Sequence, residues 1–389
     1  MKKIIMNFPS IGIVSPEFPP DIGGVENYAL GYARALSDRG YPVTLFTKRH
    51  PEGEIHPPRI EIRPELKLRR VLDRTLLKDR GIDAWHAMNA AYAWMAEETE
   101  KPVVVSVHGN DFLRAYFPVS APALYRFGPF WRWEVPWRRM ENAWRMDTTA
   151  KLRRWLPKAA CILTNSHYTE KVLLETIPAC RGKTLPALVG VDPFFLSLPL
   201  CDADRHRPIR LISITRLSEP RKNIHRVLHA LADLRQYEFH YTIVGDGREK
   251  SELEALTKSL NLQNRVSFAG RMDREDLREK LRQSDLFILT SSILPTSHEG
   301  FGLVYLEAAA CGVPSLAARL AGAAEAVAEG ESGFFVETPE TKAIATALAS
   351  FLCGETRFER EACREFARGF SWERVVKPAL PFYAGSARL

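Results

Sequence analysis

The chain has 389 residues, of which 46% are hydrophobic and 26% charged, and this length favours two domains. The apolar content excludes a disordered, collagen-like or disulfide-rich small protein. The net charge of +7 lies entirely in the first half, because residues 1–200 hold 28 Lys/Arg and 21 Asp/Glu whereas residues 201–389 hold 26 of each, so we expect the first half to face an anionic partner.

Short apolar runs alternate with helical patterns along the chain, which is typical of parallel βα units. In the first half, the patterns predict strands at 11–15, 43–47, 103–107 and 161–164, and helices at 25–39 and 167–175. In the second half, they predict strands at 209–215, 239–245, 266–269 and 286–290, and helices at 222–235, 248–260, 274–283 and 302–311. The predicted fold class is therefore α/β, with two Rossmann-like domains.

The polar segment 197–208 separates the two series and contains two prolines, which suits a linker. We predict an N-terminal domain over 1–196, a C-terminal domain over 209–370 and a terminal helical segment over 371–389. Ligands bind at the carboxyl ends of strands in open parallel sheets. Two such edges facing each other would form a deep cleft.

Membrane-spanning and secreted proteins are not expected. No run approaches 18 uncharged apolar residues, and the apolar stretch at the N-terminus is too short for a signal peptide. The six cysteines form no metal-site spacing and are expected to be small buried side chains in a reducing cytoplasm: Cys161, Cys180, Cys201, Cys311, Cys353 and Cys363.

The segment HEGFGLVYLE, from His298 to Glu307, follows a predicted strand and opens a helix. Its two glycines allow close approach of a ligand, and the N–H groups and dipole at the helix start favour a diphosphate. The carboxylates of Glu299 and Glu307 can accept hydrogen bonds from sugar hydroxyls. The alternative is an ordinary strand–helix turn with two solvated glutamates.

A basic segment follows the predicted strand at 209–215. Arg216 ends this strand, and Lys222 comes six residues later at the start of a helix. Two cations at one strand edge could neutralise a departing diphosphate, the arginine as a bidentate donor and the lysine as a point charge. A solvated basic loop is the alternative.

Two segments of the first half also lie at strand ends. Gly23 and Gly24 permit positive φ and close approach of a ligand, although they do not form a dinucleotide-binding GxGxxG motif. His108, in VHGND, is well placed for a ligand. A tight turn and a structural histidine are the alternatives, but purely structural residues would not gather at the carboxyl ends of strands in both halves.

In their order and in their residues, these segments resemble the retaining glycosyltransferases of family 4, which have the two-domain GT-B fold. The resemblance covers about residues 11–375, and its matching pieces are 16–20, 23–26, 108–111, 165–166, 190–192, 215–217 with Lys222, 245–247, and Glu299 with Glu307. It implies transfer of a hexose from a UDP- or GDP-linked sugar without a metal or other cofactor. It also implies two domains facing across a cleft and a C-terminal helix that crosses back to the first domain.

The resemblance implies roles for the matching residues. The implied donor-binding set is Gly23, Gly24, Arg216, Lys222, Arg271, Met272, Glu299, Gly300, Phe301, Gly302, Leu303 and Glu307. Within it, Glu307 would accept from the ribose, Glu299 would hold the sugar, and the base would lie against residues 271–272. The implied catalytic set is Glu299, His108, Arg216 and Lys222, with His108 near C6 of the sugar. Glu26 and Asp111 are expected on the acceptor side.

Catalysis would rest on stabilising the charge that grows on the diphosphate, through cations and oriented amides in a dry site. The sequence offers no compelling enzymic nucleophile, so we favour the leaving phosphate as the proton acceptor. The segment 290–297 before Glu299 is longer than the link common in the family and could reshape the choice of donor.

Residues 126–155 form a basic stretch that contains five of the eight tryptophans, and 126–154 hold eight Lys/Arg and three Asp/Glu. An amphipathic helix with tryptophan on one side and arginine on the other can lie among anionic lipid headgroups. The alternative is a helix packed on the first sheet. No nucleic-acid-binding motif is present. We therefore predict a cytoplasmic enzyme, peripheral on the inner face of the membrane, with a lipid-linked, lipopolysaccharide or polysaccharide acceptor.

Three other functions remain open at this stage: a transferase with a soluble acceptor, a nucleotide-sugar epimerase of the same architecture, and a sensor that has lost turnover. The pair Glu299 and Glu307, together with Arg216 and Lys222, favours transfer over the last two.

Overall fold

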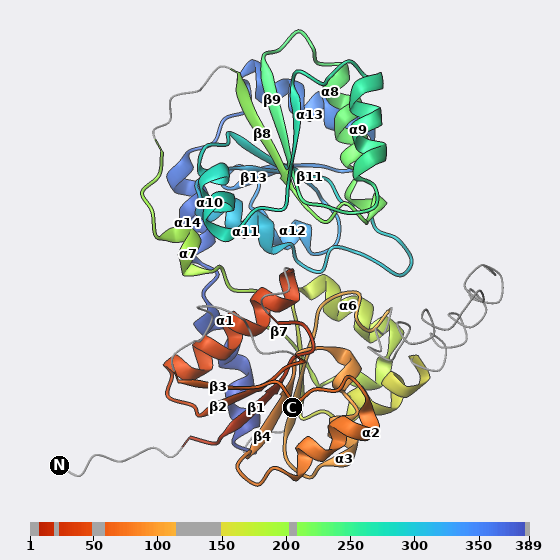
Figure 1. Ribbon diagram of the computed structural model, residues 1–389, viewed down its shortest axis with the longest axis vertical. Coiled ribbons are helices and arrows are strands. Elements are labelled where there is room, and N and C mark those ends of the chain that lie inside the picture. Colours follow the sequence, from red (N-terminus) through yellow and green to blue (C-terminus); the bar gives the residue numbers. More distant parts are fainter. Residues whose placement is uncertain (1–7, 19–22, 49–58, 114–148, 202–207, 386–389) are drawn as a thin grey trace. The chain divides into compact units, whose positions relative to one another are not determined.

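The computed structural model describes residues 8–18, 23–48, 59–113, 149–201 and 208–385. The chain divides into two compact units, the first formed by residues 1–190 and 372–389 and the second by residues 191–371. Each unit is built on one parallel sheet with helices on both of its faces (Figure 1).

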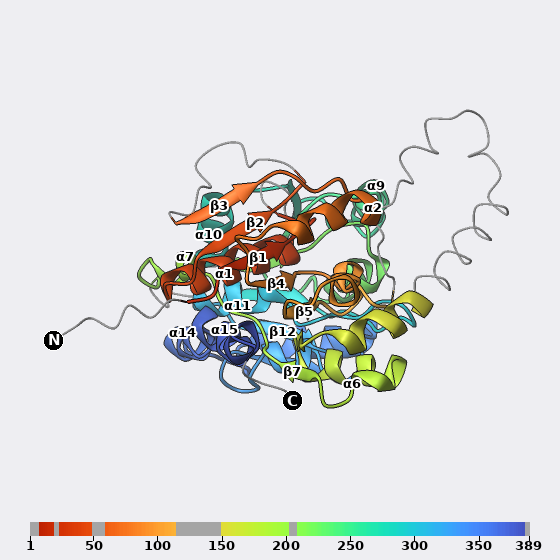
Figure 2. The same cartoon turned by 90° about the horizontal axis from the view of Figure 1, so that it is seen from below.

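The first unit contains a sheet of order β3-β2-β1-β4-β5-β6-β7 within the described residues. Its strands are β1 (Ile11–Val14), β2 (Val43–Phe46), β3 (Ile60–Arg63), β4 (Ala84–Ala87), β5 (Val103–Val107), β6 (Cys161–Thr164) and β7 (Thr184–Pro186). Its helices are α1 (Gly24–Asp38), α2 (Arg70–Asp73), α3 (Met95–Glu98), α6 (His167–Thr176), α15 (Trp372–Val376) and α16 (Leu380–Tyr383). Figure 2 shows α1 and α15 on one side of this sheet and α2 and α6 on the other.

The central strands of this sheet are buried on both faces, which explains their continuous apolar runs. Four of the five residues of β5 are valine, a β-branched residue that packs well on a pleated surface, and the whole strand is buried. In β1, a Cβ atom at Gly12 would lie 2.6 Å from the ring of Trp85 on β4. Glycine at this position therefore leaves the space that the Trp85 ring occupies.

The C-terminal segment belongs to the first unit, as the resemblance implied. The indole of Trp372 lies over α1, where a Cβ atom at Gly31 would be 2.2 Å away from it. The hydroxyl of Tyr383 lies 2.6 Å from Nδ1 of the buried His86 and 3.0 Å from the hydroxyl of Tyr32. These contacts fix α15 and α16 against the first sheet.

The second unit contains a sheet of order β10-β9-β8-β11-β12-β13 within the described residues. Its strands are β8 (Ile209–Ile214), β9 (Phe239–Val244), β10 (Val266–Gly270), β11 (Leu286–Leu289), β12 (Ser315–Ala318) and β13 (Gly333–Val336). Its helices are α7 (Pro193–Leu196), α8 (Ile224–Ala232), α9 (Lys250–Ser259), α10 (Arg274–Arg282), α11 (Leu303–Ala310), α12 (Ala323–Ala326), α13 (Thr341–Cys353) and α14 (Arg360–Arg368). Helices α8, α9 and α13 lie on one side of the sheet, and α10, α11 and α14 on the other (Figure 1).

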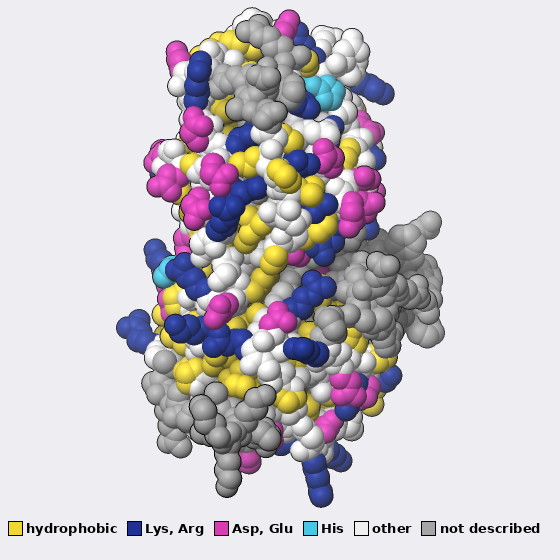
Figure 3. Space-filling view, turned by 90° about the vertical axis from the view of Figure 1, so that its left-hand side faces the viewer, with side chains coloured by type: hydrophobic (Ala, Val, Ile, Leu, Met, Phe, Trp, Pro, Cys, Tyr) yellow, Lys and Arg dark blue, Asp and Glu magenta, His cyan; other side chains and the backbone are white. Residues whose placement is uncertain are grey.

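The two units divide at Gly190 and Val191, whereas the sequence predicted the first boundary at residue 196. Helix α7 lies in the second unit because the guanidinium of Arg278 stacks 3.8 Å from the ring of Phe194. The predicted strands and helices of both halves are present to within three residues at each end. Over the second unit, the face drawn in Figure 3 carries interspersed acidic and basic side chains, in keeping with the balanced charge of residues 201–389.

Residues 126–148 of the basic stretch lie outside the described residues, and residues 149–155 at its end are helical. At its described end, Trp155 is buried, and its indole N–H donates to Glu97 at 3.0 Å. At Trp155 the alternative of packing within the first unit holds, because this side chain lies in the core of that unit. In the described part of the chain, no helix has the length and hydropathy needed to cross a bilayer.

The expectation that the cysteines are buried holds for four of them, whereas Cys201 is half-buried and Cys353 is exposed. Cys353 is exposed because it is the last residue of α13, directly before the glycine at which that helix ends.

Candidate functional site

The carboxyl edge of the second sheet is held by loops that follow β8, β9 and β11. Gly245, after β9, has φ of +135°, and a Cβ atom there would lie 1.8 Å from the carbonyl oxygen of Thr215. The amide of Leu217 donates to the carbonyl of Asp246 at 3.0 Å. These backbone contacts fix the loop after β8, which leads to Lys222.

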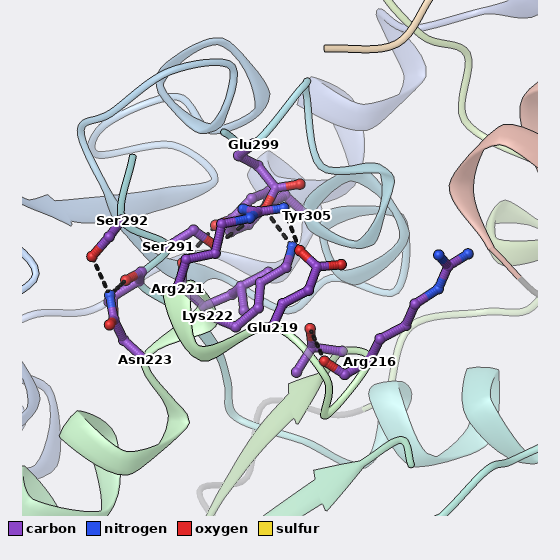
Figure 4. Close-up of polar contacts among 12 residues, drawn as sticks. Arg216, Glu219, Arg221, Lys222, Asn223, Ser291, Ser292, Glu299 and Tyr305 are labelled. Carbon is purple, nitrogen blue, oxygen red and sulfur yellow. Dashed lines mark hydrogen bonds and ion pairs between the residues drawn. The ribbon is translucent and has the colours of Figure 1, made fainter. Parts of the chain in front are cut away.

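A buried ionic cluster occupies this edge (Figure 4). Lys222 Nζ lies 2.6 Å from Glu299 Oε2, and Arg221 Nη1 lies 3.4 Å from the same oxygen. Ser291 donates to this oxygen at 3.1 Å. The Lys222 and Glu299 side chains are each 12% exposed and that of Arg221 is 5% exposed. The structure therefore brings together Lys222 and Glu299, two of the residues that the sequence analysis singled out.

The electrostatics of the cluster keep Glu299 ionised. Burial alone would raise the pKa of this carboxyl, but the charges of Lys222 and Arg221 outweigh burial and lower its pKa to about 2. Burial, followed by the charge of Arg221, lowers the pKa of His298 to about 4, so this imidazole is neutral at neutral pH.

The start of α11 is fixed beside the cluster by glycine and tyrosine. Gly302 has φ of +96°, a left-handed conformation that favours glycine, and a Cβ atom there would lie 2.5 Å from the ring of Tyr305. The Tyr305 hydroxyl donates to the carbonyl of Leu289 at the end of β11, at 2.5 Å. The backbone conformation at this strand–helix junction therefore favours glycine, whereas the sequence analysis assigned the glycines only to close approach of a ligand.

Glu307 lies in an environment opposite to that of Glu299. It is 6% exposed, and no described residue forms a hydrogen bond or ion pair with its carboxylate. Burial, followed by the nearby charge of Asp192, raises its pKa to about 7, although Arg274 counteracts this in part. A buried carboxylate without a protein partner is suited to accept hydrogen bonds from a ligand.

Arg216 does not join the cluster. Its side chain is exposed and points away from Glu299, whereas Arg221 occupies the position beside that carboxylate (Figure 4). Arg221 was not among the expected site residues, and its only signal in the sequence is that it is a second basic residue next to Lys222. Arg271 is exposed and Met272 is half-buried, and both follow β10 at the same edge of the sheet.

In the first unit, His108 follows β5 and is held by a loop of its own. Its Nε2 lies 3.0 Å from the carbonyl oxygen of Met88, and its ring meets that of Tyr28 edge-on at 4.6 Å. Asp111 accepts the amide N–H groups of His108 and Ala90, each at 2.9 Å. Asp111, expected on the acceptor side, therefore holds the backbone of the loop that carries His108.

The glycine pair before α1 does not use the positive φ that glycine permits. Gly23 is extended, with φ of 173°, and Gly24 is the first residue of the helix. A residue with a side chain can adopt either conformation, so the backbone does not require glycine here. Glu26 is buried in the first turn of the same helix.

Two family models match the chain. Residues 203–370 match the model described as glycosyl transferases group 1, and residues 22–192 match the one described as glycosyltransferase family 4. The chain belongs to glycosyltransferase family 4. In the described part of this transferase, no group of three or more His, Cys, Asp or Glu side chains is arranged to hold a metal ion.

Curated relatives extend over nearly the whole transferase. A GDP-mannose-dependent alpha-(1-6)-phosphatidylinositol monomannoside mannosyltransferase of Mycolicibacterium smegmatis is 25% identical over 377 residues, covering 89% of this chain and 90% of the relative. A glycogen synthase of Mycobacterium tuberculosis is 25% identical over 405 residues, covering 97% and 94%.

Solved structures show the fold of the transferase. Sucrose-phosphate synthase from Thermosynechococcus elongatus matches with a TM-score of 0.72 and 21% identity, over 97% of this chain and 98% of that one. An Anabaena protein in complex with UDP and glucose matches with a TM-score of 0.69 and 20% identity, over 96% and 99%. The fold is GT-B, as the resemblance implied.

Proposed function

We propose that the protein is a retaining, metal-independent hexosyltransferase that uses a nucleotide-diphosphate sugar. The observation that carries this proposal is the buried contact of Lys222 with Glu299, at 2.6 Å, beside the start of α11. Lys222 supplies a cation for the diphosphate, and Glu299 supplies an acceptor for the sugar hydroxyls. Glu307, buried and without a described partner, accepts from the ribose.

The ion pairing of Glu299 supports the leaving phosphate as the proton acceptor. A carboxylate whose pKa is lowered to about 2 by two cations is a weak base and a weak nucleophile. Such a group can orient the donor sugar but is poorly suited to form a covalent glycosyl intermediate. A trapped glycosyl–enzyme would contradict this part of the proposal.

We propose that the acceptor hydroxyl belongs to a lipid-linked, lipopolysaccharide or polysaccharide-type glycan. The name of the mycobacterial mannosyltransferase, with a phosphatidylinositol mannoside acceptor, supports a lipid-linked substrate. The positive charge of residues 1–200 and the four tryptophans between 131 and 144 support a peripheral location at the inner face of the cytoplasmic membrane. Sedimentation with anionic vesicles at low salt tests this, and failure to bind would favour a soluble acceptor.

A screen of UDP-, GDP- and ADP-sugars by thermal shift tests the donor. A donor that binds should stabilise the protein according to RT ln(1 + [L]/Kd). Glu299→Ala should then abolish transfer while largely sparing nucleotide binding, and Glu307→Ala should weaken nucleotide binding itself. The anomeric configuration of the product, read by NMR, tests retention. Donor turnover in the absence of any acceptor would favour an epimerase instead.

A further inference from the structure

Arg221 contacts Glu299 beside Lys222, and the proposed roles of the other residues leave this arginine unused. Its side chain is only 5% exposed, although arginine is rarely buried unless it is paired. Its Nη1 lies 3.4 Å from Glu299 Oε2, and its Nη2 lies 2.7 Å from Glu219 Oε2. Arg221 therefore bridges the carboxylates of Glu219 and Glu299 (Figure 4).

When a diphosphate binds, it competes with Glu299 for the Lys222 ammonium group. Glu219, Arg221, Lys222 and Glu299 carry a combined charge of zero, so both cations are already matched by carboxylates. Drawing Lys222 onto a diphosphate would remove the cation closest to the buried Glu299. An uncompensated buried charge is strongly unfavourable, so Glu299 must keep another counter-ion or take up a proton.

Arg221 is placed to remain with Glu299. Its carbonyl accepts the amide N–H of Ser292 at 2.7 Å, and the neighbouring Asn223 donates from its side chain to the carbonyl of Thr290 at 2.6 Å. These bonds hold the segment 221–223, and neither of them uses the Lys222 side chain. Within the described residues, Arg221 Nε has no hydrogen-bond partner, so no other protein group engages this donor.

We propose that Arg221 is a positioning residue that keeps Glu299 ionised and in place while Lys222 is drawn onto the diphosphate. This inference rests on the proposed function, because it requires a diphosphate beside Lys222. Without the charge of Arg221, binding of a nucleoside diphosphate should force Glu299 to take up a proton.

The groups around Glu299 make that proton measurable. Within the described residues, the ionisable side chains that interact with Glu299 besides Arg221 and Lys222 are His298 and Tyr305, and the Ser291 hydroxyl donates to it. The pKa of His298 is lowered to about 4 and that of Tyr305 is raised, so neither titrates near pH 6. Glu307 does titrate near neutrality. Its contribution is common to the wild type and to variants at position 221, so it cancels in their difference.

The test is calorimetric titration of the full chain with UDP and GDP in buffers of different ionisation enthalpy, at about pH 6. Arg221→Met should take up about half a proton or more per nucleotide beyond the wild type. Arg221→Lys should restore the wild-type value, and Arg221→Gln provides a second uncharged variant if Arg221→Met does not fold. Arg368→Met is the matched control, because Arg368 also pairs with two glutamates but is exposed. Equal proton uptake in the wild type and both uncharged variants would overturn the proposal.

A parallel titration of Lys222→Met separates this inference from the proposed function. Loss of the diphosphate cation should weaken the binding of UDP or GDP by about tenfold or more. Unchanged affinity in Lys222→Met, or no binding of either nucleotide to the wild type, would overturn both proposals. Weaker binding in Lys222→Met together with unchanged proton uptake in the Arg221 variants would overturn only the role of Arg221.

Discussion

The contact of Lys222 with Glu299 predicts a coupling that unfolding experiments can measure without knowledge of the substrate. The environment of Glu299 lowers its pKa from 4.5 to about 2, and at about 1.4 kcal/mol per unit this favours the ionised form by about 3 kcal/mol. Both side chains are largely buried, so solvent screening removes little of this value. This net value combines the favourable effects of Lys222, Arg221 and Ser291 with the opposing effect of burial, and Lys222 is the largest favourable contributor. A double-mutant cycle of Lys222→Met and Glu299→Gln should therefore give a favourable coupling of about 1 to 3 kcal/mol.

The assay is urea unfolding at neutral pH, monitored by far-UV circular dichroism. Tryptophan fluorescence would not report on this unit, because residues 191–371 contain no tryptophan. The exposed pair of Arg368 and Glu365 should show little coupling in the same type of cycle.

The direction in which stability changes with pH also follows from the lowered pKa of Glu299. A lowered carboxyl pKa contributes stability above about pH 4.5 that is lost as the pH falls toward 2. The stability of Glu299→Gln should lack this part of the acid dependence, and a cycle coupling below about 0.5 kcal/mol would refute the reasoning.

Three further changes have expected outcomes. The pKa of Glu307 is raised to about 7 in the folded protein, so the folded state loses stability as the pH rises from about 4.5 through 7. Glu307→Gln should therefore stabilise the protein by about 2 to 3 kcal/mol at about pH 8 but not at about pH 4, as measured by urea unfolding. Gly302→Ala should destabilise by about 2 kcal/mol or more, because alanine resists the left-handed conformation and its Cβ would meet the Tyr305 ring; unchanged thermal unfolding would contradict this. Tyr383→Phe leaves His86 and Tyr32 without a shared partner and should cost about 1 to 3 kcal/mol, whereas Tyr237→Phe, whose hydroxyl has no hydrogen bond in the described residues, serves as the control.

The sequence predicted the strands whose own residues are apolar enough to indicate a buried strand. The valines of β5 and the aliphatic run of β11 indicate strands because β-branched and apolar residues favour a sheet buried on both faces. The sequence analysis missed β4 (AWHA) and β12 (SLAA), which are short and rich in alanine. These segments become strands because parallel neighbouring strands on both sides complete their hydrogen bonds. This stabilisation comes from tertiary structure, so the local residue pattern does not indicate it.

Some features of the candidate site were also predictable from the sequence, whereas others were not. Lys222, Glu299 and Gly302 were predictable because each lies at a strand end next to a turn or a helix start. The burial of Arg221 was not predictable, because it depends on the segment 290–292, far along the chain, folding back onto 221–223. The opposite pKa shifts of Glu299 and Glu307 likewise depend on which charges the fold brings near each carboxylate.

A crystal structure of the full chain with the sugar nucleotide selected by the thermal-shift screen is the most direct test. We expect the diphosphate within hydrogen-bond distance of Lys222 Nζ, the sugar hydroxyls at Glu299 and the ribose hydroxyls at Glu307. A nucleotide bound elsewhere, with Lys222 still paired to Glu299 and Glu307 out of reach of the ribose, would show that these residues do not form the donor site.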